Sequence, residues 1–144
     1  MVNVHRAFGE KEVLKGFSLE IQDGTTTTII GGSGSGKSVA LKHIVGLLRP
    51  DEGNIWVDED NISRLDQESV YRLRQRVGYV FQEASLFPHL SVLDNISLAP
   101  IWVRKRPKAE AEQLARDLLE RVGIPEQAEK FPGQLSGGQQ QRVA

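Results

Sequence analysis

The chain has 144 residues, 39% of them apolar and 26% charged, which is typical of one globular domain and excludes a disordered segment or a membrane pore. Its 18 basic residues nearly balance its 19 acidic residues, so the net charge of -1 gives no reason to expect binding to nucleic acid or to an anionic membrane. No cysteine is present, which excludes disulfides and thiolate metal sites, and the three histidines are too scattered to predict a metal site.

The first part of the chain predicts strands on either side of a turn, followed by a glycine-rich loop and a helix. Residues 13–21 and the β-branched run 25–30 predict two strands, and Asp23-Gly24 supplies the turn between them. After the glycine-rich loop, apolar residues recur at helical spacing until Arg49-Pro50 stops the pattern. The order is therefore strand, glycine loop, helix.

Further along, the pattern changes from strands to helices. The predicted elements are a strand over 53–58, an amphipathic helix over 67–76, a buried parallel strand over 77–81, and helices over 92–98 and 108–122. We expect two parts, a core in residues 1–82 and a helical subdomain in residues 83–144. Two charged stretches, 58–60 and 104–108, are interpreted as a solvated turn and as the solvated start of a helix.

Residues 31–38 have the pattern of a phosphate-binding loop, with a glycine, four residues and then Gly-Lys-Ser between a predicted strand and a predicted helix. A nucleotide's phosphates must be wrapped by backbone N–H groups, and side chains at Gly34 or Gly36 would block that approach. Lys37 should reach the β- and γ-phosphates of ATP, and Ser38 should put its hydroxyl on the bridging Mg²⁺. The candidate ligands in this loop are Gly31, Gly32, Ser33, Gly34, Ser35, Gly36, Lys37 and Ser38.

Two other interpretations of this loop fit less well. A flexible glycine-serine linker would not lie between a β-branched run and an apolar helix. A dinucleotide-binding loop read from Gly32 would place Lys37 where its third glycine belongs.

A second motif follows later in the chain, Leu135-Ser136-Gly137-Gly138-Gln139. With the phosphate loop and the intervening stretch 79–82, it resembles the signature motif of ATP-binding cassette (ABC) ATPases, and the resemblance covers essentially the whole chain. Its serine and glycines open a predicted helix, which offers a second set of backbone N–H groups to an anion. The ordinary alternative is a capped helix start. In the family, this motif closes over ATP held by the phosphate loop of a partner subunit, which implies cofactor contacts from Ser136, Gly137, Gly138 and Gln139.

The resemblance implies roles for three other parts of the chain. Gln82 matches the family's glutamine that senses the Mg²⁺ and water site. The resemblance therefore implies Lys37 and Gln82 as catalytic residues, and Ser38 and Gln82 as metal contacts. Phe8 stands where an aromatic stacks on adenine, although alone it would more often be a core residue. Residues 87–96 resemble the surface that receives the coupling helix of the membrane subunit.

The fold that the resemblance implies is an α/β P-loop NTPase of ABC type, with a mixed sheet and an inserted helical subdomain, truncated before the Walker B strand. The family continues past the signature to an acid, a catalytic glutamate and a switch histidine, whereas this sequence ends at Ala144. The acidic stretch 58–60 does not replace them, because it follows a short strand before Gln82. The resemblance therefore implies groups that bind ATP and Mg²⁺, without the groups that align water.

The function implied is the ATP-binding subunit of a membrane importer, cytoplasmic and peripheral on the inner face of the cell membrane. Its expected partners are a second ATPase subunit and transmembrane subunits, and no nucleic acid. Residues 98–101 and the helix after them resemble polar amino-acid importers, whereas the first half resembles ATPases of lipid-trafficking transporters. Two alternatives stay open: a fragment that binds nucleotide without turnover, and an ABC protein with a non-transport role.

Overall fold

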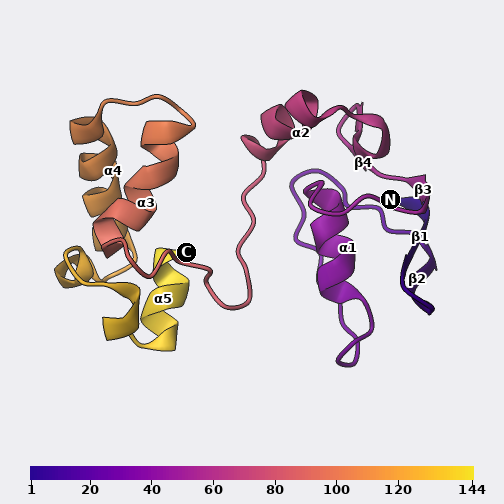
Figure 1. The fold of residues 1–144 in the computed structure, drawn as a ribbon, viewed down its shortest axis with the longest axis horizontal. Helices are drawn as coiled ribbons and strands as arrows, with labels where there is room; N and C mark the ends of the chain where they lie inside the picture. Colours follow the sequence, from indigo (N-terminus) through magenta and orange to yellow (C-terminus); the bar gives the residue numbers. More distant parts are fainter. The chain divides into compact units, whose positions relative to one another are not determined.

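A computed structural model describes residues 1–144 and divides them into two compact units, Met1–Tyr79 and Val80–Ala144 (Figure 1). The elements of the first unit are β1 (Val2–Phe8), β2 (Lys11–Phe17), α1 (Lys37–Ile44), β3 (Glu52–Asn54), β4 (Trp56–Val57), β5 (Asp60–Asn61), a 3-10 turn (Ile62–Arg64) and α2 (Gln67–Arg74). Those of the second unit are α3 (Val92–Trp102), α4 (Lys108–Arg121), two 3-10 turns (Pro125–Gln127 and Pro132–Gln134) and α5 (Gly137–Val143).

Strand β1 is the centre of the first unit's sheet, with antiparallel neighbours on both sides in the order β2-β1-β3. The sequence pattern did not predict this strand. It is fixed on one side by Val4, which faces Phe17 of β2, and on the other by Val2, which faces Asn54 of β3. The core beneath it joins strand, helix and turn residues: Val4, Leu14, Ala40, Ile55, Ile62 and Leu73.

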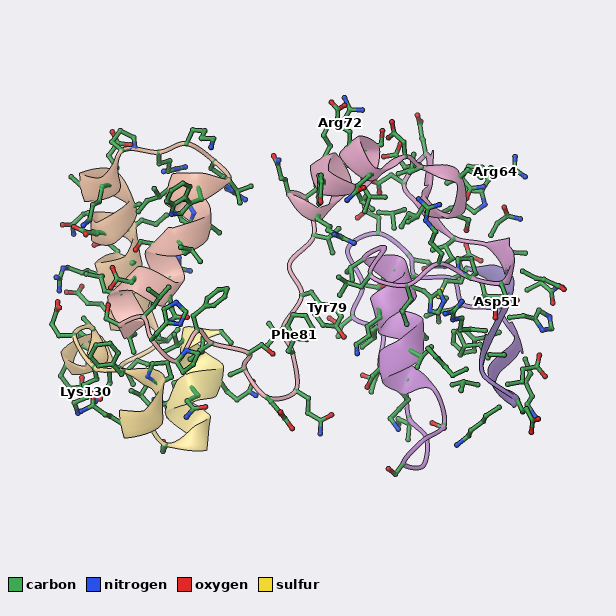
Figure 2. All side chains as sticks on the ribbon, viewed as in Figure 1. Asp51, Arg64, Arg72, Tyr79, Phe81 and Lys130 are labelled. Carbon is green, nitrogen blue, oxygen red and sulfur yellow. The ribbon has the colours of Figure 1, made fainter.

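Asp51 links β1 to the segment that leads into β3 (Figure 2). Its carboxylate accepts hydrogen bonds from the Ala7 N–H at 2.7 Å and from Arg6 Nη1 at 2.5 Å, and its own N–H donates to the His5 carbonyl at 3.0 Å. The Ala7 N–H, and after it the Arg6 charge, hold the pKa of Asp51 below its usual range. The carboxylate is therefore ionised at neutral pH and keeps the end of β1 beside this segment.

Two of the predicted strands do not form. Residues 25–30 and 77–81 are irregular, and none of their side chains is buried, with Ile30 90% exposed and Val80 62% exposed. A buried parallel strand needs a neighbouring strand to pair its N–H and C=O groups, and every ladder in this chain is antiparallel. β-branched composition favours a strand but cannot supply that partner. The predictions of a strand before the phosphate loop and of a buried strand before Gln82 are therefore wrong.

The helix after the phosphate loop is shorter than predicted, because it ends at Ile44 and not at Arg49-Pro50. Gly46 adopts a φ of 65°, and its N–H donates to the His43 carbonyl at 3.0 Å while the Leu47 N–H donates to Lys42 at 2.8 Å. A left-handed glycine with this bonding ends a helix.

The predicted strand over 53–58 also differs, since it is divided between β3 and β4. Within the acidic stretch 58–60, Asp58 and Glu59 form the exposed turn that the sequence predicted, whereas Asp60 is half-buried and begins β5, where it pairs with Val57.

Helices α3 and α4 form an antiparallel hairpin in the second unit, with α5 and the 3-10 turns packed beside it (Figure 1). Their shared core consists of Val92, Leu93, Ala115, Leu119, Ile124, Ala128, Leu135 and Val143. The chain after α4 returns to the start of α3, where the N–H groups of Val92 and Leu93 donate to the carbonyls of Lys130 and Ala128 at 2.8 and 2.9 Å. None of the helices combines the length and the apolar composition needed to cross a bilayer.

Gly53 is the position at which the first unit tolerates a side chain least. Its φ is 90°, and a Cβ built there would overlap the backbone carbonyl of Asn3 in the neighbouring β1. We expect Gly53→Ala to lower the free energy of unfolding of this unit by more than about 2 kcal/mol, because both the backbone strain and the overlap must be relieved. Amide hydrogen exchange in β1 and β3 measures the effect without assuming that the two units unfold together.

Gly78→Ala is the matched control, because that glycine has an ordinary φ and no atom within 4 Å of the added carbon. It should change the exchange free energies by less than about 0.5 kcal/mol. Equal exchange rates in the two variants would contradict this description of the β1–β3 contact.

Candidate nucleotide-binding site

The phosphate loop turns into α1 at Gly36, which is the one buried residue of the loop proper, 31–36. Gly36 caps the helix with a φ of 94°, a conformation that side chains rarely adopt. A Cβ built there would lie 3.1 Å from the Leu14 side chain and 3.2 Å from the Val13 carbonyl. The corner of the loop therefore packs directly on β2. Glycine is required here by the chain's own fold, and not only by the approach of a ligand.

Lys37 folds its side chain back over this loop. Its Nζ donates to the carbonyls of Gly31 and Gly32, both at 2.8 Å, and lies 3.5 Å from Ser35 Oγ. The first turn of α1 carries no acidic residue, and the first N–H groups of a helix have no partner within it. The ammonium and the positive end of the helix thus face the same short loop, an arrangement that suits a polyanion.

The loop also offers open space. No atom lies within 4 Å of a Cβ built on Gly32 or Gly34. Gly34 needs its glycine for a φ of 77°, but Gly32 has an ordinary backbone, so nothing in the fold itself excludes a side chain there. The loop residues Ser33 and Ser35 are exposed, and so is Ser38 in the first turn of α1. Phosphate groups could therefore reach the backbone N–H groups and the Ser38 hydroxyl.

The residues present fit Mg²⁺ only if the phosphates of a bound nucleotide supply most of its ligands. The chain has no cluster of three or more His, Asp or Glu side chains that could hold a metal ion. Mg²⁺ commonly binds to one or two protein oxygens together with substrate phosphates, and an exposed hydroxyl such as that of Ser38 suits that mode.

Phe8 lies at the end of β1 and is 45% exposed. The Arg6 guanidinium carbon lies 4.9 Å from the centre of its ring. A ring with this exposure can stack on a nucleobase, and adenine stacking by Phe8 stays a prediction.

The signature motif begins α5 in the second unit. Ser136 Oγ accepts from the Gln139 N–H at 3.3 Å, and Gln139 Oε1 accepts from the Ser136 N–H at 2.9 Å, which makes a reciprocal capping box. The preceding Leu135 is buried in the core of this unit. Gly137 and Gly138 have ordinary backbone angles and nothing within 4 Å of an added Cβ. The fold does not itself require these two glycines, and the surface above them is open.

Gln82 is connected to the signature helix by a residue that the sequence pattern did not single out. The Gln82 carbonyl accepts a hydrogen bond from Gln141 Nε2 at 2.7 Å, across 59 positions of the chain. The neighbouring Gln140 donates to the carbonyls of Pro132 and Leu135 at 2.9 and 3.3 Å. The only sequence signal for these contacts was the glutamine run after the motif. In the second unit, the structure thus brings Gln82 together with the signature helix. In the first unit, it brings the residues of the phosphate loop together.

Comparisons with known proteins point to one family. The family model described as ABC transporter matches residues 14–144. The chain is 53% identical over 142 residues to the uncharacterized amino-acid ABC transporter ATP-binding protein YhdZ of Escherichia coli, covering 99% of this chain and 56% of that protein. It is 49% identical over 144 residues to the general L-amino acid transport ATP-binding protein AapP of Rhizobium johnstonii, covering 100% of this chain and 56% of that protein. The chain thus spans a little over half the length of these relatives.

Solved structures agree on the fold. A dimeric ATP-binding cassette in a post-hydrolysis state, bound to ADP and phosphate, matches with a TM-score of 0.89 and 35% identity, over 99% of this chain and 65% of that chain. A dimeric bacterial ABC transporter cassette matches with a TM-score of 0.90 and 36% identity, over 99% of this chain and 65% of that chain. The expected ABC-type α/β fold is therefore confirmed.

The capping box at Ser136 should stabilise the first turn of α5. We expect Ser136→Ala to destabilise this helix by about 1 kcal/mol, because the Gln139 N–H loses its acceptor, whereas Ser136→Thr should retain most of the bond. Amide exchange at Gln139 and Gln140 measures the effect. Unchanged protection in Ser136→Ala would show that the bond does not hold the start of α5.

Proposed function

Since this chain belongs to the ABC transporter family of ATPases, we propose that it is the ATP-binding part of a transporter subunit that drives amino-acid import. The observation that carries the proposal is the phosphate loop, in which Lys37 lies over an open, exposed backbone at the start of α1. The transporter role rests on the relatives, whose alignments cover both halves of this chain and whose names specify amino-acid transport. That agreement favours amino acids over the lipid substrates that the first half resembled.

We assign the phosphate contacts to the first unit. Backbone N–H groups of residues 31–38 would wrap the β- and γ-phosphates of ATP, and Lys37 would exchange its two carbonyl acceptors for phosphate oxygens. This exchange favours binding, because an anionic phosphate oxygen attracts the ammonium more strongly than the dipole of a neutral carbonyl does. Ser38 would contribute its hydroxyl to Mg²⁺, which when bound neutralises charge on the phosphates. Phe8 would hold the adenine by stacking.

The second unit would contribute the remaining contacts. Ser136, Gly137, Gly138 and Gln139 would face the γ-phosphate of ATP held by a second ATPase subunit, consistent with the open surface above both glycines and with the dimeric cassettes among the solved structures. Gln82 would sense the Mg²⁺ site from its turn beside α5, with Gln141 holding its backbone. Residues 87–96 would receive the transmembrane subunits, so the protein would lie at the inner face of the membrane.

Hydrolysis is proposed for the complete protein. Residues 1–144 supply groups that bind phosphates, whereas the relatives extend well beyond the part that this chain covers. Alignment of the attacking water is the step that positioning residues control in phosphoryl transfer. We therefore assign nucleotide binding to this chain and turnover to the longer protein.

Removing the Lys37 ammonium should abolish most nucleotide binding. At a free ATP concentration about a hundred times the dissociation constant, Mg²⁺-ATP should stabilise the first unit by about 2.7 kcal/mol. In Lys37→Ala the affinity should fall by roughly tenfold to a hundredfold, because charged hydrogen bonds contribute about 1.5–3 kcal/mol. Calorimetric titration and melting with and without nucleotide measure both effects.

Lys42→Ala removes a cation from the same helix away from the loop and should bind ATP normally. Circular dichroism of each free variant separates loss of binding from loss of folding. Equal affinities for Lys37→Ala and Lys42→Ala would contradict the assignment of the loop.

Ser38 should control the Mg²⁺ dependence of binding and not binding as such. For the unmodified chain, ATP affinity should be higher with Mg²⁺ than with a chelator present. Ser38→Ala should lose most of that difference, because its hydroxyl ligand is gone, and Ser38→Thr should keep it. A full Mg²⁺ effect in Ser38→Ala would exclude this hydroxyl as a metal contact.

A further inference from the structure

The tip of the α3–α4 hairpin presents a tryptophan and a row of cations to solvent. Trp102, the last residue of α3, is 68% exposed, and Val103 after it is 52% exposed. Every residue from 102 to 110 is exposed. The sequence alone suggested only the solvated start of a helix, because the charges of 104–108 gave no sign that a large aromatic would lie open beside them.

The tip is built by specific backbone bonds. The N–H groups of Val103 and Arg104 donate to the Ala99 carbonyl at 2.9 and 3.2 Å, and that of Arg106 donates to the Pro100 carbonyl at 3.0 Å. These bonds fold the connection back onto the last turn of α3, and Lys105 takes the left-handed φ of 55° that the reversal requires. The indole and the cations are therefore held in one small region.

The positive charge of this tip is only partly compensated. No acidic residue occurs between Asn95 and Ala109, a stretch that holds four cations. Lys108 forms an exposed i,i+4 pair with Glu112 at 3.4 Å, but no ion pair involves Lys105 or Arg106. A near-neutral chain thus carries a local positive surface.

We propose that this tip binds directly to the anionic headgroups of a lipid bilayer, with the Trp102 indole inserted at the interface. Tryptophan prefers the boundary between headgroups and acyl chains, where its ring is apolar and its N–H can still donate. Basic residues beside it are attracted by the negative surface potential of anionic lipids. A nucleic acid or an acidic protein would also pair with the cations. The exposed Trp-Val pair next to them favours a bilayer, because its headgroups are charged and its acyl chains are apolar. The proposal is independent of ATP binding.

The test uses the full chain and vesicles of phosphatidylcholine with phosphatidylglycerol, against vesicles of phosphatidylcholine alone. The chain has two tryptophans, so Trp56→Phe leaves Trp102 as the only reporter. We expect its emission to shift to the blue and to be quenched by brominated lipid with anionic vesicles only. Raising the salt concentration should reverse the shift, because exposed charges are screened.

Paired variants locate the surface. Lys105→Gln with Arg106→Gln should weaken partitioning roughly 30-fold, since each cation contributes about a fivefold factor near an anionic surface. Lys11→Gln with Lys15→Gln removes the same charge from exposed positions of β2 and should have little effect. Trp102→Ala should also weaken binding, measured by sedimentation with vesicles.

Three results would overturn the proposal: no binding to anionic vesicles, an equal loss in both double variants, or binding that leaves the Trp102 emission unchanged. Tighter binding to DNA or to a polyglutamate peptide, dependent on the cations but not on Trp102, would also overturn it in favour of another polyanion. Because all these positions are exposed, circular dichroism should be the same for every variant.

Discussion

The contact between Gly36 and strand β2 fixes the geometry on which the candidate site depends. Only a residue without a side chain can take a φ of 94° this close to Val13 and Leu14. That corner sets where α1 begins, and therefore where the Lys37 ammonium and the unpaired N–H groups of the first turn point. The sheet β2-β1-β3 thus positions the phosphate loop through its contact with Gly36.

The second unit uses a different constraint for its own candidate site. A buried Leu135 anchors the start of α5, and the reciprocal bonds between Ser136 and Gln139 fix its first turn. Gln141 then extends from the same helix to the Gln82 carbonyl. Any movement of α5 would shift the Gln82 backbone through this hydrogen bond. The proposed sensor is therefore coupled directly to the signature motif. The hairpin tip at Trp102 lies on the same unit, so lipid contact and signature would share one compact body.

The sequence pattern failed where local preference and long-range pairing disagree. Residues 25–30 are all β-branched, yet they form no strand, because a strand needs a neighbouring strand and none pairs with this run. Strand β1 was missed for the opposite reason, since His5 and Arg6 interrupt its local pattern and only its pairing with two other strands makes it a strand. The end of α1 could have been read from Gly46, a glycine at the position where helices commonly stop.

The sequence by itself determined the family, the phosphate loop and the signature, because these functions need particular residue types at fixed spacing along a short stretch of chain. It also determined the helices α2 and α4, whose periodicity is local. Only the tertiary structure decided that Gly36 packs on β2, that Gln141 holds Gln82 and that Trp102 is left in solvent beside the cations. Each of these depends on which distant side chains come together, and burial and pairing across the fold are not encoded in any single window of sequence.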